Sequence, residues 1–313
     1  GEFVAFSTPT GCPPELVVET DCLGELQTSW EIMKGNNTGA AVEFARYACV
    51  STNELEGVFS LEGSSWPLLV RRGFFTNSIA GISRTSKLKK KATIIRVLQN
   101  TLEGLNMISR CNFIAEEVEV EGGDDYTVYQ VIPLGRFRTR ACITDHGEGG
   151  DSRVTQFCHH STIGEEMERY CTLAREVLGN EDLDVFAKVA WLQWAFLRIH
   201  PFADGNGRLA RIISSIPLSK LELPPVVVTT NSKPDYFAAL YRADTEADLL
   251  PLSNFLRESV LKAICDVGSF PAEAALRAGT SRLRTGPRIR RGSESSSGSS
   301  DTGSPRQHPC ADI

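Results

Sequence analysis

The sequence predicts a mainly α-helical fold with a small β-hairpin. Apolar residues recur at helical spacing through much of the chain, and Pro201 and Pro217 stand at the ends of two such segments. Alternation of apolar and polar residues is confined to the middle of the chain. The segments with helical spacing are 38–48, 94–108, 162–178, 183–199, 208–216, 234–243 and 251–265.

Two stretches in the middle of the chain carry the hairpin signal. Residues 116–132 alternate on either side of a Gly-Gly-Asp-Asp turn sequence. Residues 136–144 and 153–158 flank a second turn sequence that is rich in Gly and Asp. We therefore expect two hairpins, and a short extended segment at 226–228.

Composition divides the chain into three parts. Residues 1–37 mix Pro, Gly and Thr without a clear period, which predicts a loosely attached N-terminal arm. The periodic segments place one helical domain at 38–265. From Gly279 onward Arg, Gly, Ser and Pro dominate, so residues 266–313 are expected to form a disordered tail.

Charge and hydropathy exclude several classes of protein. The chain is 41% hydrophobic and 23% charged, which is globular composition, and its net charge of −6 argues against a chain-wide hold on nucleic acid. No run reaches the ~18–20 uncharged apolar residues of a membrane span, so we expect no membrane association. Nine cysteines, an odd number without a CxxC pair, favour reduced thiols and a cytoplasmic location. The chain starts at Gly1, which leaves an upstream targeting segment open.

The stretch 200–211, HPFADGNGRLAR, combines groups that bind phosphate. Two glycines around Asn206 let successive N–H groups point into one concavity. The helix that begins near Arg208 adds its free N–H groups and the positive end of its dipole. Arg208 and Arg211, three apart, share one helix face. These features predict an anion pocket.

The same stretch carries a carboxylate and a proton acceptor. Asp204 beside a cationic pocket suits a Mg²⁺ ion that bridges phosphate oxygens. His200 can accept a proton near neutral pH. Each piece alone has an ordinary explanation, since a His before a Pro is often a helix cap and a Gly-Asn-Gly turn is often only a turn. Together the fixed positions are too many for chance.

HPFADGNGR matches the Fic-domain signature HPFx(D/E)GN(G/K)R at every position, and the chain is identified on this resemblance as a member of the Fic family. The resemblance implies a helical fold with a β-hairpin flap, and transfer of AMP from ATP to a Ser, Thr or Tyr hydroxyl of a target protein. It implies that His200 is the catalytic base and that Asp204 holds Mg²⁺. It assigns nucleotide binding to five further residues, Gly205, Asn206, Gly207, Arg208 and Arg211.

The sequence 52–57, TNELEG, resembles the inhibitory motif (S/T)xxxE(G/N) of autoinhibited Fic proteins. By that resemblance, Glu56 pairs with Arg211 and keeps the γ-phosphate of ATP from seating productively. An inhibitory helix region is therefore expected at 41–57. Without the resemblance, the segment reads as a helix break and restart, or as a helix end stopped by Gly57 with a routine surface Glu.

Two further segments resemble parts of the family. The sequence 135–139, GRFRT, is similar to the start of the flap, which implies that Arg138 and Thr139 help to dock a target segment by β-addition. Tyr236 and Phe237 resemble a segment that lies near the adenine. The chain departs from the family in two places: Asp244 stands where animal relatives often have Asn, and a helix expected before the flap is not recognisable.

The expected partners are a target protein with a Ser, Thr or Tyr hydroxyl, ATP and Mg²⁺, with no nucleic acid and no membrane; a homodimer is left open. Two other functions use the same pocket. One is a hydrolase that removes AMP from a modified protein, with Glu56 positioning water. The other is a non-catalytic ATP-binding regulatory module, against which an intact His200 and Asp204 argue. Phosphate transfer ranks low, because Gly207 stands where that branch of the superfamily usually has Lys.

Overall fold

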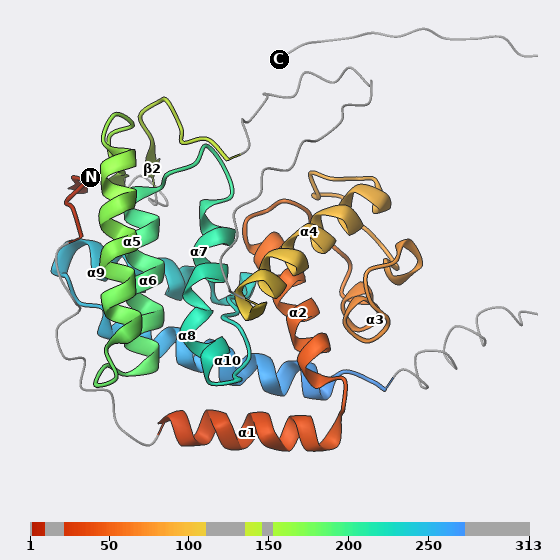
Figure 1. Cartoon of the computed structure of the whole chain (residues 1–313). Helices are drawn as coiled ribbons and strands as arrows, with labels where there is room; N and C mark the ends of the chain where they lie inside the picture. Colours follow the sequence, from red (N-terminus) through yellow and green to blue (C-terminus); the bar gives the residue numbers. More distant parts are fainter. Residues whose placement is uncertain (1, 10–21, 111–134, 146–152, 273–313) are drawn as a thin grey trace, which may run out of the picture. The chain divides into compact units, whose positions relative to one another are not determined.

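The computed structural model describes residues 2–9, 22–110, 135–145 and 153–272. Over these residues the protein is mostly helical with one small sheet, as predicted (Figure 1). The helices are α1 (Cys22–Asn36), α2 (Ala40–Leu55), α3 (Ser65–Arg72), α4 (Lys91–Arg110), α5 (Ile163–Gly179), α6 (Val185–Ile199), α7 (Asn206–Ser214), α8 (Ile216–Lys220), α9 (Lys233–Glu246) and α10 (Leu250–Ser269), with the 3₁₀ turns η1 (Thr76–Ser78) and η2 (Thr230–Ser232).

Helix α6 lies at the centre of the fold. It is apolar on nearly all sides and packs against α5, α7, α8 and α10, as expected for a buried helix. Its N-terminus is capped by Asp184, whose Oδ1 accepts hydrogen bonds from the main-chain N–H groups of Phe186 (2.7 Å) and Ala187 (3.1 Å). It ends at His200, just before Pro201. The predicted helix 183–199 is confirmed, and it carries His200 to the edge of the core.

Helix α2 contributes to two hydrophobic clusters at once. Phe44 and Leu55 belong to the larger cluster, which is built around α6. Cys49 and Val50 belong to a second cluster with residues of α3 and α4. A helix held from two sides has little freedom to shift, so the position of its last residues is well defined.

The end of α2 is a Schellman motif. The N–H of Val58 donates to the carbonyl of Asn53 (3.0 Å), and the N–H of Gly57 donates to the carbonyl of Glu54 (2.9 Å). Gly57 has φ +63°, the left-handed conformation that this motif needs. The segment 51–57 is therefore a helix end rather than a break and restart.

The sheet has the strand order β1-β3-β2. Strands β2 (Ile143–Asp145) and β3 (Arg153–Gln156) are antiparallel, with Thr144 opposite Thr155, which confirms the second predicted hairpin in shorter form. Strand β1 (Glu2–Val4), which the sequence did not indicate, pairs in parallel with β3. The first predicted hairpin, 116–132, lies outside the described residues.

The expectation of a loose arm at 1–37 is wrong for residues 22–36, which form α1. Leu26 and Trp30 are buried, and the Trp30 indole donates a hydrogen bond to the carbonyl of Glu222 (2.9 Å) while its ring meets Phe44 edge-on. The buried residues of α1 are few and spaced by three or four among polar ones, so the helical period was easily missed. At the other end, α10 extends to Ser269, beyond the expected limit of 265. No helix among the described residues is long and apolar enough to span a membrane.

Candidate active site

The turn between α6 and α7 is fixed by the side chain of Asn206. Its Oδ1 accepts a hydrogen bond from the N–H of Phe202 (2.9 Å), and its Nδ2 donates to the carbonyl of Phe202 (2.7 Å). Asn206 is buried, so these contacts are shielded from water. Both polar ends of the side chain are engaged in the turn. The contribution of Asn206 to anion binding is therefore the shape of the loop and its own N–H, not its amide group.

Asp204 lies at the rim of the turn. Its Oδ1 accepts a hydrogen bond from the N–H of Gly205 (2.6 Å), and its Oδ2 lies 3.2 Å from Nη2 of Arg208. Its side chain is 64% exposed, so a ligand can reach the carboxylate. Among the described residues, no three His, Cys, Asp or Glu side chains are arranged to hold a metal ion. One exposed carboxylate fits Mg²⁺ only when the other ligands come from phosphate oxygens and water.

The first turn of α7 faces the carboxylate of Glu56. A Cβ atom added to Gly207 would lie 2.2 Å from Oε1 of Glu56, so the carboxylate packs directly on the glycine. Gly205, with φ +84°, opens this turn in the left-handed conformation. A helix N-terminus attracts an anion through its free N–H groups and its dipole. Glu56 thus stands where an anionic ligand of this turn would bind.

Arg211 joins α7 to the end of α2. Its Nη2 donates to Oε1 of Glu56, and its Nε donates to Oγ1 of Thr52 (2.7 Å). The guanidinium is buried, while Glu56 is 35% exposed. A buried arginine paired with a partly shielded carboxylate makes a strong, charge-assisted contact. Glu56 and Arg211 are thus paired in this structure.

The imidazole of His200 is largely buried. It stacks on the ring of Phe157 with the ring centroids 4.0 Å apart. Burial is the main cause that lowers the pKa of His200 to about 4, and the positive charge of Arg138 acts in the same direction. The carbonyl of Leu197 and the carboxylates of Glu56 and Asp204 act in the opposite direction. At neutral pH the ring is uncharged, which is the form that accepts a proton.

Arg208 is held loosely by comparison with Arg211. Its interaction with Asp204 spans one helical turn at 3.2 Å, and its side chain is 23% exposed. Its Nε is buried and has no hydrogen-bond acceptor among the described residues. A buried N–H donor that lacks an acceptor and lies beside a helix N-terminus is available to an incoming anion.

The structure does not support the role expected for Arg138. Its side chain is buried, and its guanidinium donates to main-chain carbonyls, including that of His200 (Nε to oxygen, 2.7 Å). A guanidinium engaged in this way is not presented to a docking protein. Thr139, the next residue, is exposed on the surface of this segment.

The two aromatic residues of α9 differ in position. Tyr236 is buried, and its hydroxyl accepts a hydrogen bond from Nε2 of Gln193 on α6 (2.6 Å). Burial raises its pKa, and the ring belongs to the core behind Arg211. The expected contact of Tyr236 with a nucleotide is therefore at most indirect. Phe237 is partly exposed, and the ammonium of Lys233 lies 5.6 Å from its ring centroid.

The carboxylate of Asp244 contacts two side chains of α6. Its Oδ1 accepts from the Trp194 indole (2.9 Å) and lies 3.4 Å from Nε of Arg198. Burial raises the pKa of Asp244, and Arg198 opposes that shift. The group thus ties α9 to α6, and a direct contact with a nucleotide base is not its role in this geometry. The sequence singled out neither Arg198 nor Gln193, because buried polar residues in an apolar helix have no local signature.

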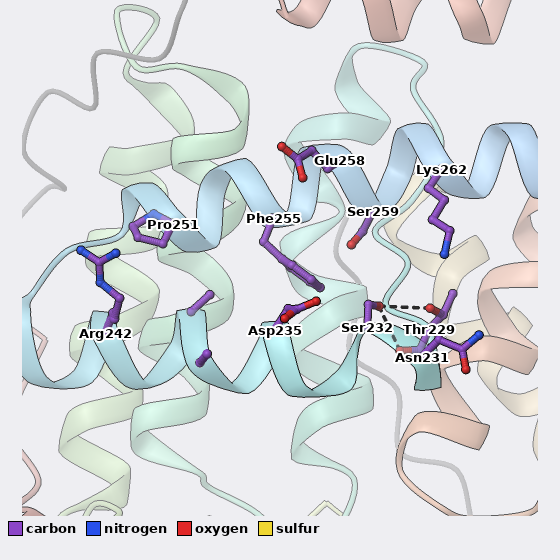
Figure 2. Close-up of a pocket in the computed structure, with 12 residues that line it drawn as sticks. Thr229, Asn231, Ser232, Asp235, Arg242, Pro251, Phe255, Glu258, Ser259 and Lys262 are labelled. Atoms are coloured by element: carbon purple, nitrogen blue, oxygen red, sulfur yellow. Dashed lines mark hydrogen bonds between the residues drawn. The ribbon is translucent and has the colours of Figure 1, made fainter.

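A cavity of about 570 Å³ lies elsewhere, between α9, α10 and η2 (Figure 2). Figure 2 shows Asp235 and Phe255 near its middle and Lys262 toward one end. None of the site residues expected from the sequence lines it. The chemistry-bearing groups gather instead at the α6–α7 turn and the end of α2.

Comparison with known proteins finds similarity to one family over part of the chain. Residues 121–218 match the model of the Fic/DOC family. A Bacteroides thetaiotaomicron Fic domain-containing signaling protein of known structure has the same fold, with a TM-score of 0.58 at 18% identity over 79% of this chain and 95% of that chain. Residues 121–218 thus resemble the Fic/DOC family, and the described fold is that of a solved Fic domain-containing protein.

Curated relatives carry more specific names. The "Protein adenylyltransferase Fic" of Nematostella vectensis is 28% identical over 123 residues, which cover 37% of this chain and 29% of that protein. The "Protein adenylyltransferase fic-1" of Caenorhabditis elegans is 30% identical over 74 residues, which cover 24% of this chain and 14% of that protein. The chain matches less than a third of the length of either relative.

Proposed function

We propose that the protein is an adenylyltransferase that moves AMP from ATP to a Ser, Thr or Tyr hydroxyl of a target protein. The observation that carries this proposal is that Glu56 is seated on the N-terminal turn of α7, where it pairs with Arg211 and acts, together with Asp204, on the imidazole of His200. The names of the relatives support the reaction class.

In this reaction, the neutral imidazole of His200 accepts the proton of the target hydroxyl. The oxygen attacks the α-phosphorus in line, the bond from that phosphorus to the α–β bridging oxygen breaks, and pyrophosphate leaves. The N–H groups of the 205–207 turn and the guanidinium of Arg208 stabilise the charge on the phosphates. Asp204 would hold Mg²⁺, which neutralises phosphate charge when bound.

We further propose that Glu56 restrains the enzyme. Its carboxylate neutralises Arg211 and lies against Gly207, so a terminal phosphate of ATP meets a like charge at the place where it would be stabilised. Removal of this one side chain should therefore activate transfer, provided that Arg211 stays in place. Thr52, which accepts from Nε of Arg211, is available to keep it there.

The experiment that tests the reaction is labelling of lysate protein with ATP that carries ³²P in the α-position, run beside ATP labelled in the γ-position. Glu56→Gly should incorporate α-label into protein and no γ-label, and Glu56→Gly/His200→Ala should incorporate neither. Label from the γ-position would show phosphate transfer instead. No label from folded, ATP-binding Glu56→Gly would contradict the transferase proposal.

A second candidate function is removal of AMP from a modified protein. The partial exposure of Glu56 favours it, because a water molecule can reach a carboxylate that is 35% exposed beside Arg211. In that reaction Glu56 would orient the water, so Glu56→Gly would abolish activity instead of raising it. Release of AMP from a pre-labelled target by wild type, lost in Glu56→Gly, would identify this function.

A further inference from the structure

Arg138 is a buried cation whose ligands are main-chain carbonyls. Its Nε donates to His200 (2.7 Å), its Nη1 donates to Arg140 (2.7 Å), and its Nη2 donates to Cys158 and to Ile199 (3.3 Å). Its own N–H donates to the carbonyl of Pro201 (2.9 Å). No Asp or Glu forms an ion pair with it within the described part of the chain, although burial of an unpaired charge is costly.

The carbonyls of Ile199, His200 and Pro201 lie at and just after the C-terminal end of α6, that of Cys158 follows β3, and that of Arg140 lies in the same segment as Arg138. The last carbonyls of a helix have no partner inside the helix and carry the negative end of its dipole. A guanidinium offers five donors in a rigid fork, so one side chain can satisfy several of them together. Arg138 therefore fastens the flap segment to the end of the helix that carries His200.

His200 needs such support, because its backbone is unusual. It has φ 51° and ψ 58°, the left-handed conformation that non-glycine residues seldom adopt. Strained residues of this kind persist only where their surroundings over-determine them. Here the carbonyls of Ile199, His200 and Pro201, which are consecutive residues, all accept hydrogen bonds from Arg138.

The ring of His200 is held through the same residue. Phe157, which stacks on the imidazole, precedes Cys158, whose carbonyl also accepts from Arg138. The N–H of Cys158 donates to the carbonyl of Arg198 (3.3 Å), so this segment and α6 are joined on both sides. Arg138 thus fixes the backbone that carries the imidazole and the strand end that carries its stacking partner.

We propose that Arg138 is a positioning residue for His200: its buried guanidinium locks the left-handed turn at the end of α6 and holds the imidazole against Phe157. Its charge also disfavours a second cation at His200. The consequence for AMP transfer rests on the proposed function, whereas the positioning itself can be measured in the protein without nucleotide.

Three charged groups act on the imidazole from the elements around it. Arg138 acts from the flap segment, Glu56 from the end of α2, and Asp204 from the α6–α7 turn. Loss of the Arg138 charge leaves the two carboxylates, both of which favour the protonated ring. The direction of the expected change is therefore fixed: removal of Arg138 raises the pKa of His200.

The test is an NMR titration of the histidine rings in isotopically labelled full-length protein. The chain has five histidines, and His200 is assigned by the signal missing from His200→Ala. In Arg138→Met, the pKa of His200 should rise from about 4 toward its ordinary value of 6.5. The ring chemical shifts of His200 should change more than those of any other histidine. Arg138→Lys keeps the charge but loses the fork, so it should move the titration less while still changing the ring shifts.

The matched control is Arg136→Met, which removes an exposed cation two residues away in the same segment. It should leave His200 unchanged. If Arg138→Met fails to fold, Arg138→Lys carries the test. A His200 titration and ring shifts that stay as in wild type, in either folded Arg138 variant, would overturn the proposal.

A second readout concerns the reaction. In the Glu56→Gly background, Arg138→Lys should lower kcat by about 10²-fold with little change in the KM for ATP, because a displaced base affects the chemical step. The acidic limb of the pH profile of kcat should follow the His200 titration measured by NMR. If Glu56→Gly shows no transfer while the NMR changes occur, the positioning role stands and the transferase proposal falls.

Discussion

The α6–α7 turn and the end of α2 meet at one site but are held in different ways. The turn closes on itself, since Asn206 binds the main chain of Phe202 four residues earlier and Asp204 binds the N–H of its neighbour Gly205. The end of α2 is closed by its own Schellman motif, but Thr52 and Glu56 there also contact Arg211, more than 150 residues away in sequence. The Phe202–Asn206 part of the turn is thus a local structure, and the contact of Glu56 with Arg211 is a tertiary one. The bonds of Asn206 within the turn can therefore persist when the Glu56–Arg211 contact is released.

The largest expected effect is on the turn. His200→Ala should lower transfer by about 10²–10⁴-fold, because it removes the proposed proton acceptor. The variant should keep its far-UV circular dichroism and its ATP affinity, since the imidazole makes no contact that holds the turn closed. Initial rates with α-labelled ATP in the Glu56→Gly background measure the loss. A rate within threefold of the parent would remove His200 from the role of base.

Asn206→Ala tests whether the turn is self-supporting. The substitution leaves the N–H and the carbonyl of Phe202 without their buried partner, which should lower the free energy of unfolding by about 1–3 kcal/mol. Urea denaturation measures it, with Asn231→Ala on the exposed η2 turn as the matched control that should change little. Equal midpoints for the two variants would mean that the turn is held from elsewhere.

Thr52→Val tests the contact between the end of α2 and Arg211 by removal of one acceptor atom, Oγ1 of Thr52. It removes the acceptor of Arg211 Nε but leaves Glu56, so the guanidinium should be less firmly held and inhibition partly relieved. We expect a gain in transfer of several-fold, smaller than that of Glu56→Gly, since a single hydrogen bond to a charged group contributes about 1.5–3 kcal/mol at most. In Glu56→Gly the same change should raise activity no further. An additional gain there would place Thr52 outside the inhibitory contact.

Stability should fall on acidification, with His200 as one cause. The folded-state pKa of about 4 lies below the ordinary value of 6.5, so between these values the unfolded chain binds more protons than the folded protein. Stability from this group is complete above pH 6.5 and is lost as the pH falls toward 4, by up to about 3 kcal/mol. Urea denaturation of wild type and His200→Asn at pH 7 and pH 4.5 checks this. The variant should lose less stability, and an identical loss would contradict the depressed pKa.

The turn was predictable from sequence because its residues act on their neighbours. The order His-Pro-Phe-Ala-Asp-Gly-Asn-Gly-Arg encodes a helix stop, a glycine-rich turn and a new helix start. The stop before Pro201 is confirmed, whereas α7 spans Asn206–Ser214 and so begins and ends two residues before the predicted 208–216. The Glu56–Arg211 pair was predicted only through resemblance, since no spacing rule links residues so far apart. The two side chains are in contact in the structure, and the inhibitory role of the pair stays a prediction.

Arg138 and Tyr236 mark the limit of such reasoning. Both were expected to face a ligand, and both are buried, because each satisfies polar groups of α6 that come from distant sequence. Helix α1 was missed for a related reason: it packs against α10 and α2, and Trp30 also contacts the segment after α8, none of which a local window contains. Tertiary packing, not local propensity, decides these positions.

The most direct test of the account is the initial rate of α-label transfer by Glu56→Gly relative to wild type at saturating ATP. Glu56→Gln, which keeps the shape but loses the charge, should also be activated, and Glu103→Gln, which removes an exposed carboxylate of α4, should match wild type. We predict a gain of at least tenfold for Glu56→Gly that disappears when His200→Ala is added. Equal rates for wild type and Glu56→Gly, with Arg211 intact and the protein folded, would contradict the claim that Glu56 occupies the anion site of an active transferase.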